Sequence, residues 1–332
     1  MPKIVEIQDI GESDWKELVE VSSVASWFQT PEAYGFFRSL SFLEVFAVGV
    51  VEQGGLKGVV VGYIQKDGGR INQFLSRRAI VTGGPLLADD ISDEALALLL
   101  KELKTGLRHK AIYIETRNFN DYGRWRGVFE QCGFMYEPHL NYHVNCSSKE
   151  MVWKNLKENR KRQIKKALAG GVKIEEAISE DEVTVFYYLL SDLYKKKVKT
   201  PLFPKEFFLE FYRKGCGKYL LVKDNGEIIG GIMCPILGNR TIYELFVYGN
   251  DTEYKSKYPS VMATWAAMDY AVNNGISRFD FMGAGKPGVA YGVRDFKSKF
   301  GGELVEYGRC ICVCKPLLFA IGKFGVKMMK KL

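Results

Sequence analysis

Residues 278–302 read RFDFMGAGKPGVAYGVRDFKSKFGG, and in this stretch a strand pattern, a glycine-rich loop and a short helix pattern follow one another. The apolar residues Phe279 and Phe281 alternate with polar ones, as in a half-buried strand. Residues 294–299 have room for a short helix, and Gly301 follows it where glycine commonly ends helices. We expect the strand over residues 304–313 to complete the unit. This order of elements predicts an α/β domain.

The first half of the sequence repeats the same order of elements. A short strand at residues 112–115 precedes a helix at residues 121–131, which stops before Gly133. A strand at residues 140–145 follows. Gly133 therefore corresponds to Gly301, and the chain is predicted to hold two similar α/β domains rather than one large one.

The boundaries of these domains follow from the helix between them. We expect an N-terminal domain at residues 1–146, a basic linker helix at 147–171, a C-terminal domain at 172–314 and a basic amphipathic tail at 315–332. Ser147 and Glu150 have capping-box spacing at the start of the linker helix, and Gly170 and Gly171 end it. In the C-terminal domain, Asp224-Asn225-Gly226 predicts a β-hairpin turn.

Composition narrows the class of protein. A chain of 332 residues with 47% hydrophobic and 26% charged residues is globular and long enough for two domains. Its net charge of +8 favours an anionic partner, although a basic protein without one is equally compatible. Seven cysteines without paired spacing indicate a reducing compartment. No signal peptide or spanning segment is evident, so we expect the protein in the cytoplasm.

The linker helix carries the main charge signal. Its basic residues are Lys154, Lys157, Arg160, Lys161, Arg162, Lys165 and Lys166. At about 100° per residue, all but Arg160 fall on one half of the helix. That face either binds a polyanion or is simply solvated. Arg160 falls among the apolar residues, where its guanidinium needs a buried carboxylate or a substrate anion as partner.

The glycine-rich loop is the second candidate site. Its glycines allow close approach of backbone to a ligand, which makes Gly283 and Tyr291 candidate substrate-binding residues, while a plain surface loop is the alternative. Cys310, Cys312 and Cys314 alternate and would share one face of a core strand. The three histidines lack metal-site spacing, so we expect no metal.

The tail contains five lysines and no acidic residue among apolar ones. Such a segment either lies on an anionic membrane surface at the inner face of the membrane or packs back onto its domain.

Taken together, these stretches resemble the FemAB family of peptidyl aminoacyltransferases, from about residue 26 to about residue 307. The matching stretches are Trp27–Glu32, Gly83–Leu86, Trp153–Ala167, Arg278–Gly283 and Phe296-Lys297-x-x-Phe300-Gly301. The resemblance implies two acetyltransferase-like (GNAT-like) domains, each a mixed, mostly antiparallel sheet flanked by helices. It also implies transfer of an aminoacyl group from aminoacyl-tRNA to an amine of a UDP- or lipid-linked muropeptide, with no further cofactor.

The resemblance also assigns residues. Phe296 and Lys297 match the Phe-Lys pair that serves the transfer step in the family. Arg160, Tyr248 and Asp280 lie in stretches that line or shape the family's cleft, and Arg38 matches a basic residue that holds the precursor's phosphates. The long coiled-coil insertion of some family members has no counterpart in this sequence.

Related double-domain enzymes use acyl-CoA, which gives an alternative function as an N-acyltransferase acting on a cell-envelope or small-molecule amine. Such enzymes commonly bind the CoA pyrophosphate with a Gln/Arg-x-x-Gly-x-Gly/Ala turn that opens a helix. The corresponding place here reads Lys255-Ser256-Lys257-Tyr258-Pro259-Ser260, which does not fit that pattern.

The expected chemistry is attack of a neutral amine on the ester carbonyl of the aminoacyl-tRNA. A fixed cation beside the oxygen that becomes charged lowers the barrier, and Lys297 is the candidate. Asp280 is the candidate general base. A non-catalytic binder of anionic glycan precursors or nucleic acid is the third hypothesis, and it predicts salt-sensitive binding without a product.

Overall fold

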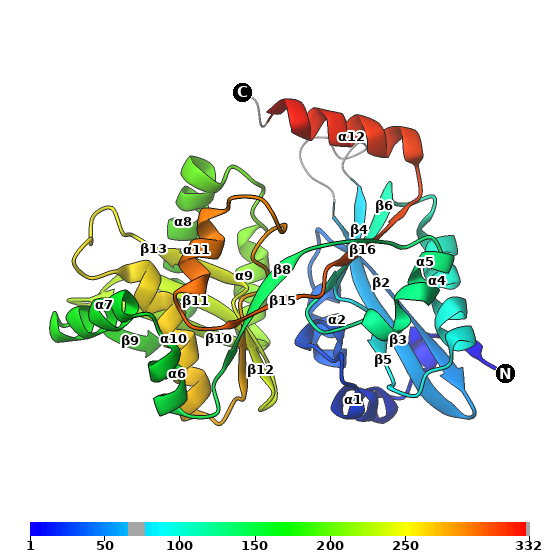
Figure 1. Cartoon of the computed structure of the whole chain (residues 1–332), viewed down its shortest axis with the longest axis horizontal. Helices are drawn as coiled ribbons and strands as arrows, with labels where there is room; N and C mark the ends of the chain where they lie inside the picture. The colour runs from blue at the N-terminus through cyan, green and yellow to red at the C-terminus, as the bar shows by residue number, and fades with distance from the viewer. Residues whose placement is uncertain (66–76, 330–332) are drawn as a thin grey trace. The chain divides into compact units, whose positions relative to one another are not determined.

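The structure is a computed structural model that describes residues 1–65 and 77–329. The chain forms two compact units of similar size (Figure 1). Unit 1 comprises residues 1–138 and 307–332, and unit 2 comprises residues 139–306. Each unit is built on a sheet of mostly antiparallel strands with helices against it, so the expected fold class is confirmed.

Unit 1 is built on an eight-stranded sheet of order β1-β2-β3-β4-β6-β16-β7, with β5 paired to β3 outside this path. Its strands are β1 (Lys3–Glu6), β2 (Glu44–Glu52), β3 (Gly55–Gln65), β4 (Arg78–Gly83), β5 (Leu86–Leu87), β6 (Tyr113–Asn118), β7 (Met135–Glu137) and β16 (Arg309–Val313). The pair β4–β6 is parallel, and the other strand pairs of this sheet in the described residues are antiparallel.

Unit 1 has helices on both faces of its sheet and a C-terminal helix, α12, that follows β16. They are α1 (Glu12–Val21), α2 (Pro31–Arg38), α4 (Asp93–Leu107), α5 (Arg126–Gln131) and α12 (Pro316–Met329), with short 3-10 turns η1 (Ile7–Asp9), η2 (Trp27–Gln29) and η3 (Gly123–Trp125). Val60 and Ile64 join Leu99 of α4 in one core cluster. The ring of Tyr63 instead packs at 5.2 Å from that of Phe37 of α2. Adjacent residues of β3 therefore face different layers, as the pleat of a strand requires.

Unit 2 is built on a second eight-stranded sheet, of order β15-β8-β14-β12-β11-β10-β9, with β13 paired to β11. Its strands are β8 (Leu140–Asn145), β9 (Lys173–Glu176), β10 (Gly217–Asp224), β11 (Glu227–Leu237), β12 (Thr241–Tyr243), β13 (Phe246–Gly249), β14 (Arg278–Asp280) and β15 (Glu303–Glu306). The hairpin predicted at Asp224-Asn225-Gly226 joins β10 to β11, and Asn225 and Gly226 both have positive φ. Again one pair is parallel, β12–β14.

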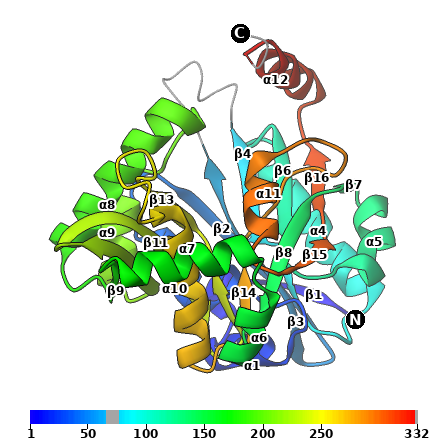
Figure 2. The ribbon, with the colours of Figure 1, turned by 60° about the vertical axis from the view of Figure 1, so that its left-hand side comes forward.

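The helices of unit 2 are α6 (Lys149–Asn155), α7 (Glu158–Ala169), α8 (Glu180–Leu193), α9 (Lys205–Arg213), α10 (Pro259–Asn273) and α11 (Gly292–Ser298), with a π-helical turn η4 (Tyr194–Val198). Figure 2 shows α7 and α10 in green and amber. Val222 of β10 and Met262 of α10 belong to one core cluster, which α6 and α7 also join. Tyr219 of β10 packs instead against Phe186 of α8, with ring centroids 5.6 Å apart.

The structure divides the chain differently from the expected domains. Residues 140–145 were expected in the first domain, but β8 lies between β14 and β15 in unit 2. Residues 304–313 were expected to form one strand, but they form β15 in unit 2 and β16 in unit 1, where β16 lies between β6 and β7. The alternation of residues in a strand specifies which face is apolar but not which sheet the strand joins. The sequence pattern therefore missed that β8 joins unit 2 and that β16 joins unit 1.

The expected linker helix is also different. It is two helices, α6 and α7, separated at residues 156–157, and both pack in unit 2. Ser148, not Ser147, is the N-cap of α6, since its hydroxyl accepts a hydrogen bond from the Met151 amide.

The cysteine pattern is explained by packing. Cys310 and Cys312 of β16 lie in the core of unit 1, as expected for a core strand. In residues 1–65 and 77–329, no group of three or more His, Cys, Asp or Glu side chains is placed to hold a metal ion.

The tail forms α12, whose Phe319 ring packs 5.2 Å from that of Tyr113 in unit 1. Residues 330–332 of the expected tail lie outside the described part of the chain. None of the described helices is both long and apolar enough to cross a membrane.

Candidate functional site

The candidate site lies where two parallel strands of unit 2 end. Strand β12 pairs with β14 from Thr241 opposite Arg278 to Tyr243 opposite Asp280. Because the strands are parallel, the segments that follow them leave the same edge of the sheet. Glu244 follows β12, and residues 281–285 follow β14. Ligand sites of α/β sheets commonly lie at such carboxyl ends.

Lys297 of α11 points into this edge. Its ammonium donates to the carbonyl oxygens of Phe281 at 2.7 Å and Gly283 at 3.0 Å, and lies 3.1 Å from Oε1 of Glu244. It also lies 5.2 Å from the centre of the Phe281 ring. The side chain is only 11% exposed, so Lys297 is not an ordinary surface lysine of a short helix. An ammonium group has three N–H donors, and each of them has an acceptor here.

Glu244 is the buried partner of this lysine, and no sequence motif pointed to it. Its carboxylate is 3% exposed, and its Oε2 accepts a hydrogen bond of 3.1 Å from the hydroxyl of Thr264 on α10. Its backbone amide donates to the carbonyl of Asp280, which ties the end of β12 to β14. Burial raises the pKa of Glu244, and the ammonium of Lys297 opposes that rise without cancelling it.

Asp280 is fully buried beside the edge. Its Oδ1 accepts from Nδ2 of Asn141 at 2.7 Å and from the Met282 amide at 2.6 Å, and its Oδ2 lies 3.0 Å from Nε2 of His143. Burial alone would raise the pKa of Asp280, but His143 and the hydrogen bond from Asn141 hold it below its usual value. A buried carboxylate whose pKa is lowered, with two hydrogen bonds on Oδ1 and an imidazole beside Oδ2, accepts a proton poorly. The geometry therefore argues against Asp280 as general base and favours a role in holding the turn.

The turn after β14 is held in an unusual backbone conformation. Met282 has φ of 57° and Gly283 has φ of 135°. The Asn141 side chain accepts a 2.7 Å hydrogen bond from the Gly283 amide. Asn141 and Asp280 together fix the turn whose carbonyls receive Lys297. A left-handed residue other than glycine persists only where its surroundings enforce it, and such positions gather at functional sites.

Arg160 occupies the packed face of α7, as its helical position predicted. It is 5% exposed, and its guanidinium carbon lies 4.4 Å from the centre of the Phe296 ring and 5.1 Å from that of Phe300. Its other contacts are Oε1 of Gln163 at 2.6 Å and the carbonyl of Phe296 at 3.4 Å. Of the two partners expected for Arg160, a buried carboxylate is not in contact with it here, and aromatic faces lie against its guanidinium instead. Arg160 holds the residue next to Lys297.

The glycine-rich loop is organised by a residue that sequence reasoning passed over, Arg294 of α11. Its guanidinium donates to the carbonyls of Ala284 at 2.8 Å and Val289 at 2.9 Å, and also to that of Lys286. The ring of Tyr291 packs on Gly285, where a Cβ would lie 2.8 Å from that ring. An arginine in the first turn after such a loop was the available signal.

Two predicted substrate-binding residues belong to other elements. Arg38 is exposed at the end of α2 in unit 1, with its guanidinium 5.6 Å from the centre of the Tyr34 ring. Tyr248 is 8% exposed in β13 of unit 2, paired with Gly231. The structure thus brings Asp280, Gly283 and Lys297 together directly, and Phe296 with Arg160 beside them.

The basic face of α7 is a surface feature. Its exposed members are Lys157, Arg162, Lys165 and Lys166, with Lys154 of α6. Lys161 is the less exposed member and pairs with Glu158 at 2.7 Å. Most of this face therefore keeps its charge free to meet an anion.

The start of α10 is occupied by an acidic side chain. Oδ1 of Asp251 accepts a 3.2 Å hydrogen bond from the Ser260 amide. Pro259 contributes no N–H to this turn, and Tyr258 precedes it with φ of 51°. A carboxylate at a helix N-terminus competes with any phosphate for the same amides.

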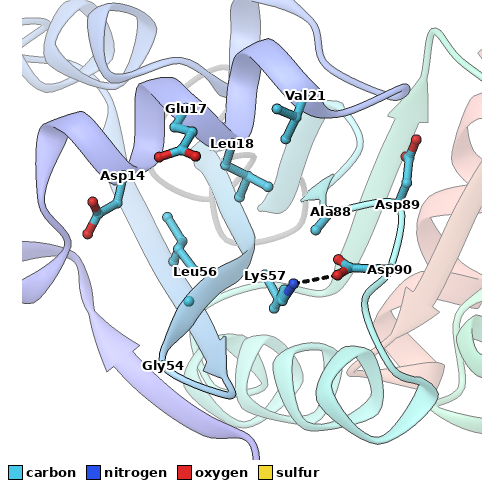
Figure 3. A pocket seen from close by; sticks show the side chains of 11 residues that line it. Asp14, Glu17, Leu18, Val21, Gly54, Leu56, Lys57, Ala88, Asp89 and Asp90 are labelled. Carbon is cyan, nitrogen blue, oxygen red and sulfur yellow. Dashed lines mark hydrogen bonds and ion pairs between the residues drawn. The ribbon is translucent and has the colours of Figure 1, made fainter.

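Unit 1 contains a pocket of about 600 Å³ (Figure 3). It lies between α1 and the segments around Gly54 and Ala88, and its charged lining residues are Asp14, Glu17, Lys57, Asp89 and Asp90. Lys57 is paired with Asp90 at 2.6 Å. The acidic lining is unsuited to a polyanionic substrate.

Residues 154–298 match the family model described as an acetyltransferase (GNAT) domain. This range contains Arg160, Glu244, Asp280 and Lys297. Most of unit 2 therefore matches a GNAT acetyltransferase domain, and this match supports an acyltransferase.

Solved structures extend the likeness to both units. The chain is similar to FemX, with a TM-score of 0.74 over 96% of this chain and 99% of that one at 14% identity. It is also similar to the C-terminal domain of a putative lysylphosphatidylglycerol synthetase from Agrobacterium fabrum, with a TM-score of 0.59 over 93% of each chain at 11% identity. A tandem GNAT protein from the clavulanic acid biosynthesis pathway gives 0.57 over 95% of this chain and 99% of that one, at 13% identity.

These likenesses define the fold, and the resemblance to the FemAB family drawn from the motifs is confirmed at that level. No curated protein sequence matches the chain.

Proposed function

We propose that the protein is an aminoacyltransferase of FemAB type, which moves an aminoacyl group from aminoacyl-tRNA to an amine of a UDP- or lipid-linked peptidoglycan precursor. The observation that carries the proposal is the largely buried ammonium of Lys297 at the ends of β12 and β14. A cation held in a site with little water stabilises a developing oxyanion far better than one in bulk solvent.

In the proposed reaction, the neutral acceptor amine attacks the ester carbonyl of the donor. The C–N bond forms, the bond to the ribose oxygen breaks, and the nitrogen loses a proton while the ribose oxygen gains one. Negative charge grows first on the carbonyl oxygen and then on the leaving oxygen. We assign to Lys297 the role of stabilising one of these oxygens, and to Phe296 and Arg160 that of holding α11 in position. No protein nucleophile takes part in this scheme.

The donor RNA is proposed to contact the basic face of α7. The exposed side chains of that face match the negative charge of a nucleic-acid backbone, and binding should weaken as salt is raised. The name of the synthetase neighbour supports aminoacyl transfer as a reaction of this fold.

The alternative donor is acyl-CoA, and one observation bears on it. Pro259 lacks an N–H, and Asp251 already accepts from the Ser260 amide, so the N-terminus of α10 offers fewer free amides to a CoA pyrophosphate. This favours the aminoacyl donor. The GNAT match to the same unit keeps acetyl-CoA as the compound to test against it.

The deciding experiment incubates the protein with a pool of charged tRNAs and with UDP-linked or lipid-linked muropeptide, and reads products by mass spectrometry. The proposal expects a muropeptide heavier by one or more aminoacyl residues, only when charged tRNA is present. A parallel thermal-shift measurement with acetyl-CoA should show no stabilisation. A clear shift with acetyl-CoA and no aminoacyl product would establish the alternative.

The tail is proposed to contact the membrane that carries a lipid-linked acceptor. Leu317 and Ile321 lie one turn apart on α12 and are 82% and 58% exposed, while Lys323 of the same helix is 63% exposed and lies 3.6 Å from Glu137. Apolar and basic side chains on one short helix suit an anionic lipid surface. Co-sedimentation with vesicles of anionic lipid, compared with neutral ones, tests this: Leu317→Ser should reduce binding to the anionic vesicles.

A further inference from the structure

The ammonium of Lys297 has no unused N–H. Its acceptors are two backbone carbonyls and one carboxylate oxygen, at 2.7, 3.0 and 3.1 Å. A substrate oxygen can therefore bind this group only by replacing one of the three. The contacts around each acceptor determine which of the three can be replaced.

The two carbonyls are fixed in place. Those of Phe281 and Gly283 flank a turn that Asp280 and Asn141 hold through the Met282 and Gly283 amides. Removing an acceptor there would require the turn to move and would leave a backbone carbonyl without its partner in a buried place, which costs about 1–3 kcal/mol.

Glu244 differs from the carbonyls in two ways. Its carboxylate has a second donor, the hydroxyl of Thr264, so it keeps a hydrogen bond if the ammonium turns away. It also makes the longest of the three contacts with Lys297. Its raised pKa agrees with a carboxylate whose charge is only partly stabilised by its surroundings.

We infer that Glu244 is a positioning residue for Lys297: it holds the third ammonium proton in the resting site, and the developing oxyanion replaces it as acceptor. The inference rests on the proposed function for the identity of that oxyanion. Glu244 keeps the lysine oriented in a site with little water, and no solvent has to be displaced from the ammonium during the reaction.

The test compares Glu244→Gln, which keeps an acceptor oxygen but removes the charge, with Glu244→Ala and Thr264→Val. Glu182→Gln is the matched control, because Glu182 pairs with Lys223 in the same unit, outside the site. We expect kcat to fall about 10-fold in Glu244→Gln and further in Glu244→Ala, with KM nearly unchanged. Thr264→Val should have a smaller effect, and Glu182→Gln none.

The pH profile separates this role from a structural one. Wild-type kcat should fall on the acid side as Glu244 takes up a proton, at a pH above that of an ordinary carboxyl because burial raises its pKa. Glu244→Gln should lack this limb. A wild-type profile in Glu244→Gln, or an equal loss at every pH with the limb intact, would overturn the inference.

A second readout does not depend on the substrate. In ¹⁵N-lysine NMR, the ammonium protons of Lys297, assigned with Lys297→Arg, should exchange slowly with water and should exchange faster in Glu244→Ala. Unchanged exchange overturns the inference whatever the substrate is. Lack of any aminoacyl product from the wild-type protein would instead count against the proposed function, and the exchange measurement would still decide the pairing.

Discussion

Each unit contains a parallel strand pair among its described residues, and the side chains at the carboxyl ends of the two pairs differ in charge. In unit 1, β4 and β6 run parallel to Gly83 opposite Asn118, and the chain then turns through Gly84. Nε2 of Gln29 donates to the carbonyls of Gly83 at 3.2 Å and Gly84 at 2.8 Å, and the Tyr122 hydroxyl lies 2.9 Å from the Gly83 carbonyl. In unit 2, the same place holds Glu244 and Lys297.

The difference is one of charge, and it separates scaffold from site. A buried amide and phenol satisfy the backbone in unit 1 with neutral groups and leave little room: a Cβ at Gly84 would lie 2.7 Å from Tyr122. A buried ammonium and carboxylate in unit 2 carry the cost of removing charge from water, which proteins rarely accept without a functional reason. The GNAT family match falls on unit 2 alone.

The largest expected effect is loss of activity on removing the charge in unit 2. Lys297→Ala should lower kcat about 10²- to 10³-fold, the loss typical of removing one donor to an oxyanion. Steady-state turnover in the aminoacyl-transfer assay measures it. Lys101→Ala, an exposed lysine on α4 of unit 1, is the matched control. Normal turnover by a folded Lys297→Ala protein would mean that the charged strand end of unit 2 is no more catalytic than the neutral strand end of unit 1.

Asp280→Asn should destabilise unit 2 in a pH-dependent way. Because the folded-state pKa of Asp280 is lowered, its stabilising contribution is full above the pKa of an unfolded aspartate and is lost as pH falls through the lower folded value. We expect a deficit of about 2–3 kcal/mol at neutral pH, since the hydrogen bonds involve a charged group. The deficit should shrink below the usual pH range of an aspartate.

Urea unfolding of wild type and Asp280→Asn at several pH values measures this difference. Glu303, exposed on β15 of the same unit, gives the control Glu303→Gln. A deficit that stays constant down to strongly acid pH would mean that Asp280 acts through shape rather than charge.

A substitution at the neutral strand end of unit 1 should lower the free energy of unfolding and leave kcat nearly unchanged. Gln29→Ala leaves the Gly84 carbonyl without the Gln29 donor and leaves the Gly83 carbonyl with Tyr122 alone, which should cost about 1–3 kcal/mol. Per folded molecule, kcat should stay within about twofold of wild type. Denaturant unfolding and active-site-normalised turnover measure the two quantities, with the exposed Gln131→Ala as control. A selective loss of kcat would show that the neutral strand end also serves the reaction.

Local patterns predicted local features of this molecule, and long-range pairing escaped them. The 100° spacing of α7 placed Arg160 on the packed face, and Asn225-Gly226 located the hairpin. Glu244 lies between two short strands, β12 and β13, where no alternation or helical spacing of residues marks it. It meets Lys297 because β12 and β14 pair side by side.

His143 and Asn141 were missed for a related reason. They belong to β8, which the sequence pattern assigned to the first domain but which pairs with β14. Alternation of apolar residues does not encode the partner strand, so the surroundings of Asp280 could not be assembled from the sequence.

The smallest expected effect concerns the loop beside the charged strand end, for which unit 1 offers only the short Gly83-Gly84-Pro85 turn. Arg294 donates to the carbonyls of Ala284, Lys286 and Val289, so Arg294→Ala should release this loop without removing any group from the Lys297 cluster. We expect KM to rise about three- to tenfold, with kcat changed less, because a loop that must be ordered on binding reduces affinity by that cost. Amide hydrogen exchange should accelerate in the loop and not in β14.

Arg108→Ala, exposed at the end of α4 in unit 1, controls for loss of a surface charge. If exchange in the loop stays at the wild-type rate while kcat collapses, then Arg294 acts on the reacting groups themselves, and the charged site of unit 2 extends beyond the ends of its parallel strands.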